Sequence, residues 1–357
     1  MYQALYRAFR PETFDDLIGQ DHIVKILKNQ IASDTVGHAY LFCGTRGTGK
    51  TTTARLLAKA LNCTSEGERP CGECDTCRAI AAGTFIDVTE LDAASNNSVD
   101  DIRTLREEVN FPPAVGRKKV YIIDEVHMLS TQAFNAFLKT LEEPPKDTVF
   151  ILCTTDPNKL PATIQSRCIR LDFRRVPESV IRARFRDICA KIGVKADEDA
   201  LALLAGSADG SVRDGLSLLD LCIGSGDMLT REDVLDLLGM APSELFVKLT
   251  DCVRTGDAAG ALIAFAETLS EGKEALQVGR DWLDHFRSLM IIKFSDEPQN
   301  ILNLSAENIE RLKVQAEATD MAFISASIKT LSQALLDARW AARPRTLIEL
   351  AIIEMCR

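Results

Sequence analysis

The first half of the chain alternates short apolar runs with segments of helical periodicity. Each run contains β-branched or aromatic residues and is bounded by glycine, proline or charged residues, a pattern that predicts strands buried on both faces. Because helical segments separate the runs, we expect βαβ units in a parallel sheet. The predicted strands lie at 38–44, 85–92, 119–125, 149–155 and 168–173. A helix is predicted at 131–143, where Phe134, Phe137 and Leu141 form one stripe and Pro144 follows.

Beyond about residue 175 the apolar positions follow helical spacing instead. Ile324, Ile328 and Leu331 recur at helical intervals, and no further strand is expected. A break containing glycine and proline at 239–242 separates two helical stretches. We therefore predict an α/β domain at 1–174, a small helical domain at 175–240 and a second helical domain at 241–357.

Composition and charge narrow the class of protein. Of the 357 residues 46% are hydrophobic and 26% charged, which excludes a mostly disordered chain. No apolar run reaches ~18 residues, so no transmembrane helix is expected. The opening segment MYQALYRAFRPETF lacks the apolar core of a secretory signal, so we expect a cytoplasmic protein. The net charge of −10 is unlike that of a nucleic-acid coat protein and confines any DNA contact to a few side chains.

The segment GTRGTGKT at 44–51 fits the phosphate-loop pattern G-x-x-x-x-G-K-[ST]. An apolar run ends directly before it and a helical run begins at Lys50, which is the context that the motif requires. Glycines let backbone N–H groups surround phosphates, and the N-terminus of the helix adds a positive dipole. We predict that Lys50 reaches the β- and γ-phosphates and that Thr51 binds magnesium; the alternative is a glycine-rich turn before an ordinary helix. The residues expected to bind the nucleotide here are Gly44, Thr45, Arg46, Gly47, Thr48, Gly49, Lys50, Thr51 and Thr52.

Two acidic residues, Asp124 and Glu125, end another apolar run. The carboxyl ends of parallel strands are where α/β sheets place ligands. With a phosphate loop upstream, Asp124 is predicted to hold magnesium, directly or through water, and Glu125 to polarise the attacking water; alone, the pair also fits a solvated strand exit. Thr154 and Thr155 end a third run. They lie beside the γ-phosphate if that strand neighbours the phosphate-loop strand, and otherwise they cap the strand.

Four of the 11 cysteines cluster in the pattern C-x7-C-x2-C-x2-C. Paired C-x2-C spacings let thiolates converge on one tetrahedral zinc ion, and disulfides are the less favoured alternative in a cytoplasmic chain. Four sulfur ligands leave zinc no open position, so we predict a structural site inserted between the phosphate-loop helix and the second strand. The predicted ligands are Cys63, Cys71, Cys74 and Cys77, within a knuckle at 63–77. The other seven cysteines lie mostly in apolar stretches and are interpreted as small buried residues.

The order of these motifs resembles that of AAA+ ATPases of the clamp-loader type. Besides the phosphate loop and the acidic pair, the chain carries Ser166-Arg167-Cys168 and, further on, Gly210-Ser211-Val212-Arg213-Asp214. The opening box at 6–20, the segment HML after the acidic pair and the segment LEEPP at 141–145 are also similar. With the inserted four-cysteine knuckle, the chain resembles the family of bacterial DNA polymerase III gamma and tau subunits.

The motifs of that family are specific from residue 2 to about 240, and from 241 to 357 the resemblance rests on helical pattern and position. The resemblance implies an α/β fold: an AAA+ P-loop domain with a parallel sheet and an inserted zinc knuckle, then a small helical lid domain. It also implies an all-α collar domain that packs against neighbouring subunits, with a self-contained bundle as the alternative. The chain ends where the shorter, gamma-like form of the family would end.

Roles for single residues follow from the resemblance. Thr155, or less favourably Thr154, would sense the γ-phosphate, and Arg213 would reach the nucleotide from the lid domain. Arg167 would be an arginine finger in the neighbouring subunit's site, because the guanidinium fork matches phosphate oxygens. The adenine pocket would be lined by Arg10, Pro11 and Ile18, whose alternative role is ordinary packing.

The implied function is that of a motor subunit of the replicative clamp loader, a DNA-dependent ATPase that uses ATP, Mg²⁺ and structural Zn²⁺. ATP binding would lock subunits into a spiral through Arg167 and hold the sliding clamp open, and hydrolysis would release the clamp on primed DNA. An arginine finger supplied in trans is worth ~10³–10⁵ in rate, so the isolated chain is expected to be a poor ATPase.

The implied partners are other clamp-loader subunits, delta-like and delta-prime-like, in a pentameric ring, together with the sliding clamp and primer–template DNA. No membrane is involved, and the expected location is the cytoplasm at the nucleoid. For DNA, the segment 92–98 precedes a predicted helix at 99–109 that carries Arg103 and Arg106. Its N-terminal amides are suited to backbone phosphates, whereas the acidic first turn opposes such contact, so both alternatives stay open.

Three other functions compete with this interpretation. Another AAA+ motor, such as a branch-migration helicase or a protein remodeller, is disfavoured by the knuckle and by the placement of Ser166-Arg167-Cys168. A non-hydrolysing scaffold requires a broken phosphate loop, but Lys50, Asp124 and Glu125 are all present. A polymerase requires carboxylates for two-metal nucleotidyl transfer, and no such group of residues is evident; the polymerase belongs to the holoenzyme in which such a subunit works.

Overall fold

The structure is a computed structural model. It describes residues 3–95, 105, 107–223, 228–238, 243–270, 272–298, 301–302 and 306–357. The chain divides into two compact units. One consists of Met1–Ile188 with Ser207–Asp220, and the other of Cys189–Gly206 with Leu221–Arg357.

The first unit contains a five-stranded parallel sheet, and all five predicted strands are confirmed. The strand order is β2-β3-β4-β1-β5. Every residue of β1 and β4 is buried, whereas the edge strands β2 and β5 are partly exposed, which matches the apolar character of the central runs. The strands are β1 (Ala39–Cys43), β2 (Val88–Asp92), β3 (Lys119–Asp124), β4 (Thr148–Thr154) and β5 (Ile169–Asp172).

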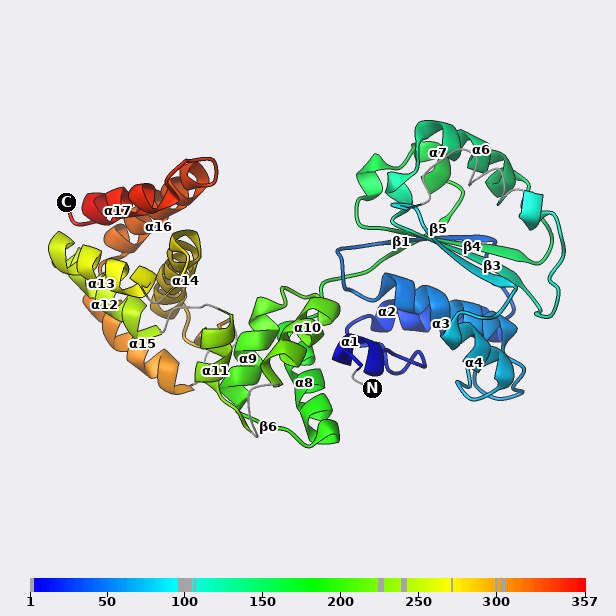
Figure 1. Ribbon diagram of the computed structural model, residues 1–357, viewed down its shortest axis with the longest axis horizontal. Helices are drawn as coiled ribbons and strands as arrows, with labels where there is room; N and C mark the ends of the chain where they lie inside the picture. Colours follow the sequence, from blue (N-terminus) through cyan, green and yellow to red (C-terminus); the bar gives the residue numbers. More distant parts are fainter. Residues whose placement is uncertain are drawn as a thin grey trace. The chain divides into compact units, whose positions relative to one another are not determined.

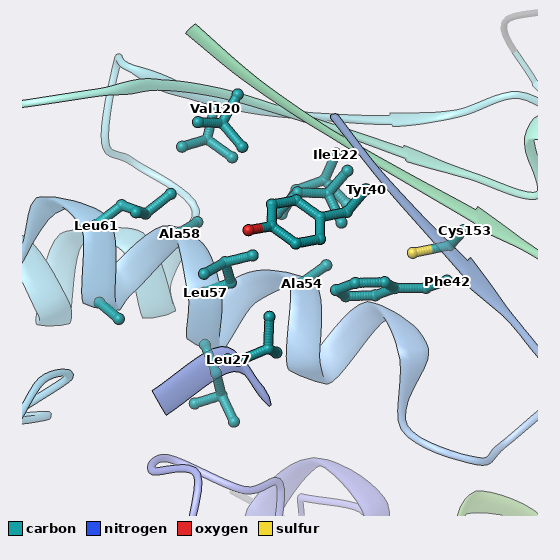
Figure 2. Packing of buried hydrophobic residues seen from close by; sticks show 14 of the residues in the cluster. Leu27, Tyr40, Phe42, Ala54, Leu57, Ala58, Leu61, Val120, Ile122 and Cys153 are labelled. Atoms are coloured by element: carbon teal, nitrogen blue, oxygen red, sulfur yellow. The ribbon is translucent and has the colours of Figure 1, made fainter. Parts of the chain in front are cut away.

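Helices cover both faces of this sheet (Figure 1). On one face lie α2 (Asp21–Ala32) and α3 (Lys50–Asn62), with α4 (Asp75–Ala82) packed on α3. On the other lie α6 (Thr131–Glu142) and α7 (Ala162–Gln165). The sheet has a hydrophobic core on each face. Figure 2 shows the core on the side of α2 and α3, in which Tyr40 and Phe42 of β1 pack against Leu57 of α3. The helix predicted at 131–143 is confirmed as α6. The Ser130 side chain caps it by accepting a hydrogen bond from the Ala133 N–H.

Short elements and the helices that reach the second unit complete this part of the chain. The N-terminal helix α1 (Leu5–Ala8) has one turn, and 3-10 turns follow β3 at Val126–Met128 and β4 at Pro157–Lys159. The helices α8 (Glu178–Ile192) and α10 (Val212–Ile223) each begin in the first unit.

Among the residues that the structure describes, the second unit is helical apart from two residue pairs. Its core is formed around Trp282, Phe286 and Leu331, and Ile324 and Leu331 are buried as the helical spacing predicted. The expectation of no further strand is wrong in one detail: β6 (Lys195–Ala196) pairs in parallel with β7 (Met228–Leu229). Two-residue strands are too short to produce an alternating pattern. The helices are α9 (Glu198–Ser207), α11 (Arg231–Leu237), α12 (Ser243–Arg254), α13 (Ala258–Ser270), α14 (Ala275–Phe294), α15 (Ala306–Ala318), α16 (Met321–Ala338) and α17 (Pro344–Met355).

Within the described residues, no helix has both the length and the apolar character that a membrane span requires.

Candidate active site and metal centre

The carboxyl ends of β1, β3 and β4 lie side by side at one edge of the sheet. Cys43 at the end of β1 is opposite Thr154 of β4, and on the other side of β4 Ile123 is opposite Leu152. The phosphate-loop segment, the acidic pair and Thr155 therefore follow three adjoining strands. This is the condition under which the threonines lie beside the loop, and the edge is where parallel sheets bind ligands.

The loop between β1 and α3 turns on its glycines. Gly44, Gly47 and Gly49 have φ angles of 151°, 74° and 101°, which other residues rarely adopt. A Cβ atom at Gly44 would lie 2.6 Å from the carbonyl oxygen of Phe173, so the close approach also requires glycine. Because α3 begins at Lys50, its first-turn N–H groups lie at the end of the loop. The segment thus has the backbone geometry of an anion-binding loop.

Lys50 is buried within this loop. Its ammonium group donates to the carbonyl oxygens of Gly44 and Thr45 at 2.8 and 2.9 Å. Burial lowers the pKa of Lys50, and the nearby carboxylates of Glu125 and Asp124 act in the opposite sense. The loop therefore holds a charged donor where a phosphate would be cradled.

Thr51 and Asp124 meet directly. The Thr51 hydroxyl donates to Asp124 Oδ2 at 2.7 Å, although 73 residues separate them. A hydroxyl and a carboxylate are both oxygen ligands of the kind that Mg²⁺ prefers. The two residues predicted to hold magnesium are thus adjacent, and their donor set fits that ion.

The second acidic residue, Glu125, points to the end of β4. The Thr155 hydroxyl donates to Glu125 Oε2 at 2.9 Å, and the Thr155 N–H donates to the same oxygen at 3.2 Å. His127 Nδ1 lies 3.4 Å from that oxygen and 3.0 Å from the Thr154 hydroxyl. Glu125 has φ 45° and ψ 45°, a left-handed conformation that is costly for a residue with a side chain. In the sequence His127 belongs to the family-like segment HML after the acidic pair, but no role in the site was assigned to it.

Arg167 lies at the surface after α7. Its guanidinium donates to Glu142 Oε1 at 2.6 Å and to the carbonyl oxygen of Thr163 at 2.7 Å. The side chain is 34% exposed, so the ion pair is solvent-accessible and weak. The sequence did not indicate Glu142 as a partner of Arg167, because the pairing joins α6 to the turn before β5.

The N-terminal segment packs against the phosphate loop and α3. Arg10 Nε donates to the Thr52 hydroxyl at 3.2 Å, and Pro11 and Ile18 are half-buried in the same segment. Burial and the charge of Arg55 lower the pKa of Arg10, and Arg213 contributes in the same direction. Gln20 is fully buried and donates to the carbonyl oxygens of Thr48 and Arg174. Gln20 ends the family-like box at 6–20, and its bonds tie the loop to the segment after β5, a role that the sequence did not indicate.

Arg213 lies in the first turn of α10, beside the phosphate loop. The Val212 N–H donates to the carbonyl oxygen of Gly47 at 3.1 Å. A Cβ atom on Gly47 would overlap the Ser211 hydroxyl, so α10 approaches the loop at a point where only glycine fits. The Arg213 side chain is exposed and its Cζ lies 5.3 Å from the centroid of the Tyr6 ring.

The four clustered cysteines converge as predicted. Their Sγ atoms all lie within 4.8 Å of one another, and zinc–thiolate bonds of ~2.3 Å in a tetrahedron place sulfurs about 3.8 Å apart. All 11 cysteines lie in the described part of the chain and none forms a disulfide. Burial opposes ionisation of Cys74, but hydrogen bonds from Thr64 and Cys77 outweigh it and lower the pKa of Cys74 to about 6. The donor set fits a four-thiolate zinc site of structural type.

The predicted DNA-binding segment lies mostly outside the described residues. Residues 96–104 and 106 lie outside the described residues, and they include Arg103 and Arg106.

Three family models match consecutive parts of the chain. The model described as "DNA polymerase III, delta subunit" matches residues 19–177, and "DNA polymerase III clamp loader subunit, ATPase lid domain" matches 180–228. "DNA polymerase III subunits gamma and tau domain III" matches 229–357.

Curated proteins and solved structures are similar as well. DNA polymerase III subunit tau of Bacillus subtilis is 42% identical over 359 residues, which cover all of this chain and 63% of the relative. The subunit tau of Escherichia coli is 46% identical over 275 residues, covering 76% of this chain and 43% of the relative. The chain thus spans less than two thirds of either protein. The RuvB Holliday junction branch migration motor of Thermotoga maritima shares the fold, with a TM-score of 0.50 and 17% identity over 69% of this chain and 79% of that one.

Proposed function

This chain belongs to the family of DNA polymerase III gamma and tau subunits, and from that premise we propose that it is an ATP-hydrolysing motor of a sliding-clamp loader. One observation carries the proposal: the Thr51–Asp124 pair and the Glu125–Thr155 pair meet beside Lys50 at three adjoining strand ends. A non-hydrolysing scaffold has no need of this arrangement. The structural likeness to the branch-migration motor concerns the fold alone, so it lends that alternative no further support.

In this proposal the phosphate loop binds the nucleotide, and the residues at the strand ends carry out hydrolysis. The backbone N–H groups of the loop bind the phosphates, and Lys50 offsets the charge of the β- and γ-phosphates. Glu125 takes a proton from water as the water oxygen bonds to the γ-phosphorus and the bond to the bridging oxygen breaks, which yields ADP and phosphate. Thr51 and Asp124 would hold Mg²⁺, which would supply neutralisation of the phosphate charge.

Three further residues couple the nucleotide to its surroundings. Thr155 senses the γ-phosphate, and its hydroxyl leaves Glu125 when it does so. Arg213 senses the same phosphate from α10. Arg167 acts as the arginine finger in a neighbouring subunit, for which it must leave Glu142. Arg10, Pro11 and Ile18 line the adenine pocket in this assignment.

The zinc site has a structural role. Cys63, Cys71, Cys74 and Cys77 would hold Zn²⁺ and staple a polar loop that follows α3. No catalytic position remains open on a four-thiolate zinc ion.

Membership of the family supports the domain layout and the partners that we propose. We assign the ATPase domain to 1–174, the lid domain to 175–240 and a collar domain to 241–357. The partners are delta-like and delta-prime-like subunits in a pentameric ring, the clamp, and primer–template DNA contacted through its backbone. We place the assembly in the cytoplasm at the nucleoid.

Steady-state ATP hydrolysis with the presumed loader subunits tests the proposal. Clamp and primed DNA are added or withheld, and Lys50→Ala and Arg167→Ala are compared with Arg170→Ala, an exposed arginine paired with Asp172. We expect clamp and DNA to raise the rate strongly, both functional variants to abolish the rise, and Arg170→Ala to retain it. If clamp and DNA leave the rate of ATP hydrolysis unchanged, the chain is an ATPase of another pathway.

A further inference from the structure

The aromatic ring of Tyr6 contacts the arginine that the proposed function assigns as a phosphate sensor. The Cζ atom of Arg213 lies 5.3 Å from the centroid of the Tyr6 ring, within the ~6 Å range of a cation–π interaction. Tyr6 is half-buried in α1, whereas Arg213 is exposed in the first turn of α10. The ring therefore limits the freedom of a side chain that is otherwise open to solvent.

The backbone at Arg213 is held beside the phosphate loop. The Val212 N–H donates to the Gly47 carbonyl oxygen at 3.1 Å, and the Ser211 hydroxyl donates to Asp214 Oδ2 at 2.6 Å, within the same turn of the helix. The position of the Arg213 Cα is thus set by the loop itself. The direction of its long, many-rotamer side chain is not set by these backbone contacts.

The backbone of α1 is anchored as well, so Tyr6 can act as a fixed surface. Leu5 is buried, and its N–H donates to Asp220 Oδ2 of α10 at 3.3 Å. Arg184 of α8 donates to the Phe9 carbonyl oxygen at 3.4 Å. One turn of helix without a capping side chain is weak alone, and these contacts hold it against α8 and α10.

The same N-terminal segment reaches the other side of the candidate site. Arg10 follows α1 directly and donates to the Thr52 hydroxyl of α3. One short stretch of chain therefore contacts both the helix that begins with Lys50 and the helix that carries Arg213.

We propose that Tyr6 is a positioning residue: its ring holds the Arg213 guanidinium beside the phosphate loop, and it thereby sharpens the preference of the site for a nucleoside triphosphate over a diphosphate. The inference rests on the proposed function, which assigns Arg213 to the γ-phosphate. Arg7 also approaches the ring, with its Cζ 5.7 Å from the centroid, but it is an exposed neighbour within α1.

Nucleotide affinities of the full chain test this role. We would measure the Kd of a fluorescent non-hydrolysable ATP analogue and of the matching ADP for Tyr6→Phe, Tyr6→Leu, Arg7→Ala, Arg213→Ala and the double variant Tyr6→Leu/Arg213→Ala. Tyr6→Leu should weaken triphosphate binding about 2- to 5-fold, the range expected for an exposed cation–π contact, and leave ADP binding unchanged. Tyr6→Phe keeps the ring and should rescue the affinity, and Arg7→Ala should not weaken it.

The double variant separates the two levels of the argument. With Arg213 already removed, Tyr6→Leu should have no further effect, because a contact can be lost only once. Additive losses, or equal losses for ATP analogue and ADP, would overturn the positioning role while leaving the proposed function intact. If Arg213→Ala itself fails to weaken triphosphate binding selectively, the sensor assignment is wrong and the role of Tyr6 falls with it.

Discussion

A buried histidine should make the stability of the C-terminal helices depend on pH. His285 of α14 is 7% exposed, and its Nε2 lies 2.8 Å from Gln315 Oε1. The amide nitrogen of Gln315 donates to the Val247 carbonyl oxygen and to Asp251 Oδ1, so its oxygen is the accepting end. His285 therefore carries a proton on Nε2 and donates it to Gln315 Oε1. Burial lowers the pKa of His285 to about 4, although the bond to Gln315 and the charge of Asp251 oppose this.

The direction of the effect follows from proton binding. In the unfolded chain the histidine has its ordinary pKa of 6.5. Between pH 6.5 and about 4 the unfolded chain therefore binds a proton that the folded chain does not bind. The contribution of His285 to stability is present above pH 6.5 and is lost as the pH falls through this window. Linkage gives a loss of about 2 kcal/mol between pH 7.5 and pH 5.0, and about 3 kcal/mol once the pH is below 4.

The chain has a built-in reporter for this measurement. Of its two tryptophans, Trp282 is fully buried beside the histidine and Trp340 is 89% exposed. In a Trp340→Phe background the fluorescence of Trp282 alone follows unfolding of the C-terminal bundle in urea. Unfolding free energies at pH 7.5 and 5.0 would be compared between this chain and the same chain with His285→Gln.

The glutamine variant keeps every other titrating group, so the difference in pH dependence isolates His285. We expect His285→Gln to be less stable at pH 7.5 but to lose about 2 kcal/mol less on acidification. If both chains lose the same free energy between the two pH values, the reasoning from burial to a depressed pKa is refuted.

Three predictions concern the candidate site. Asp124→Asn should retain nucleotide binding in the absence of Mg²⁺ but lose most of the Mg²⁺-dependent gain in affinity, because it weakens the oxygen pair with Thr51. Nucleotide titrations with and without Mg²⁺ measure this gain. An unchanged gain would argue against Thr51 and Asp124 as Mg²⁺ ligands. Gly47→Ala should raise the Kd for a triphosphate at least about tenfold, since its Cβ meets Ser211. The control Gly193→Ala has a similar positive φ with open space around it and should cost only the backbone strain of about 1–2 kcal/mol in stability. Cys74→Ser should lower the bound zinc content and the melting temperature while nucleotide binding survives. The control Cys252→Ala should leave the zinc content at the wild-type value. Equal zinc content in both variants would show that Cys74 is not a zinc ligand.

Much of the fold could be predicted from the sequence because it depends on local patterns of residues. The buried strands β1, β3 and β4 are continuous apolar runs, and the helix at Lys50 begins where the glycines end. The phosphate loop and the four cysteines are also encoded by spacing over a few residues. Where the signal is weak, as in β6 and β7, two hydrogen-bonded residues leave no periodicity to detect.

Other features depend on which strands become neighbours. No local pattern predicts the neighbours of β4, yet its pairing with β3 brings Thr155 to Glu125. Its pairing with β1 brings the end of β4 beside the phosphate loop. From the sequence, a place for Thr154 and Thr155 beside the γ-phosphate could therefore be predicted only on the condition that their strand neighbours the phosphate-loop strand. Arg167 with Glu142 and Val212 with Gly47 are likewise contacts between segments far apart in the chain.

The sequence by itself determined the residue types, the elements that carry them and the chemistry each can perform. Only the tertiary structure decided the partners: Asp124 with Thr51, Glu125 with Thr155, and Tyr6 with Arg213. The physical reason is that helix and strand formation follow interactions over a few residues, whereas side-chain partners are selected when the burial of whole elements fixes their order and register.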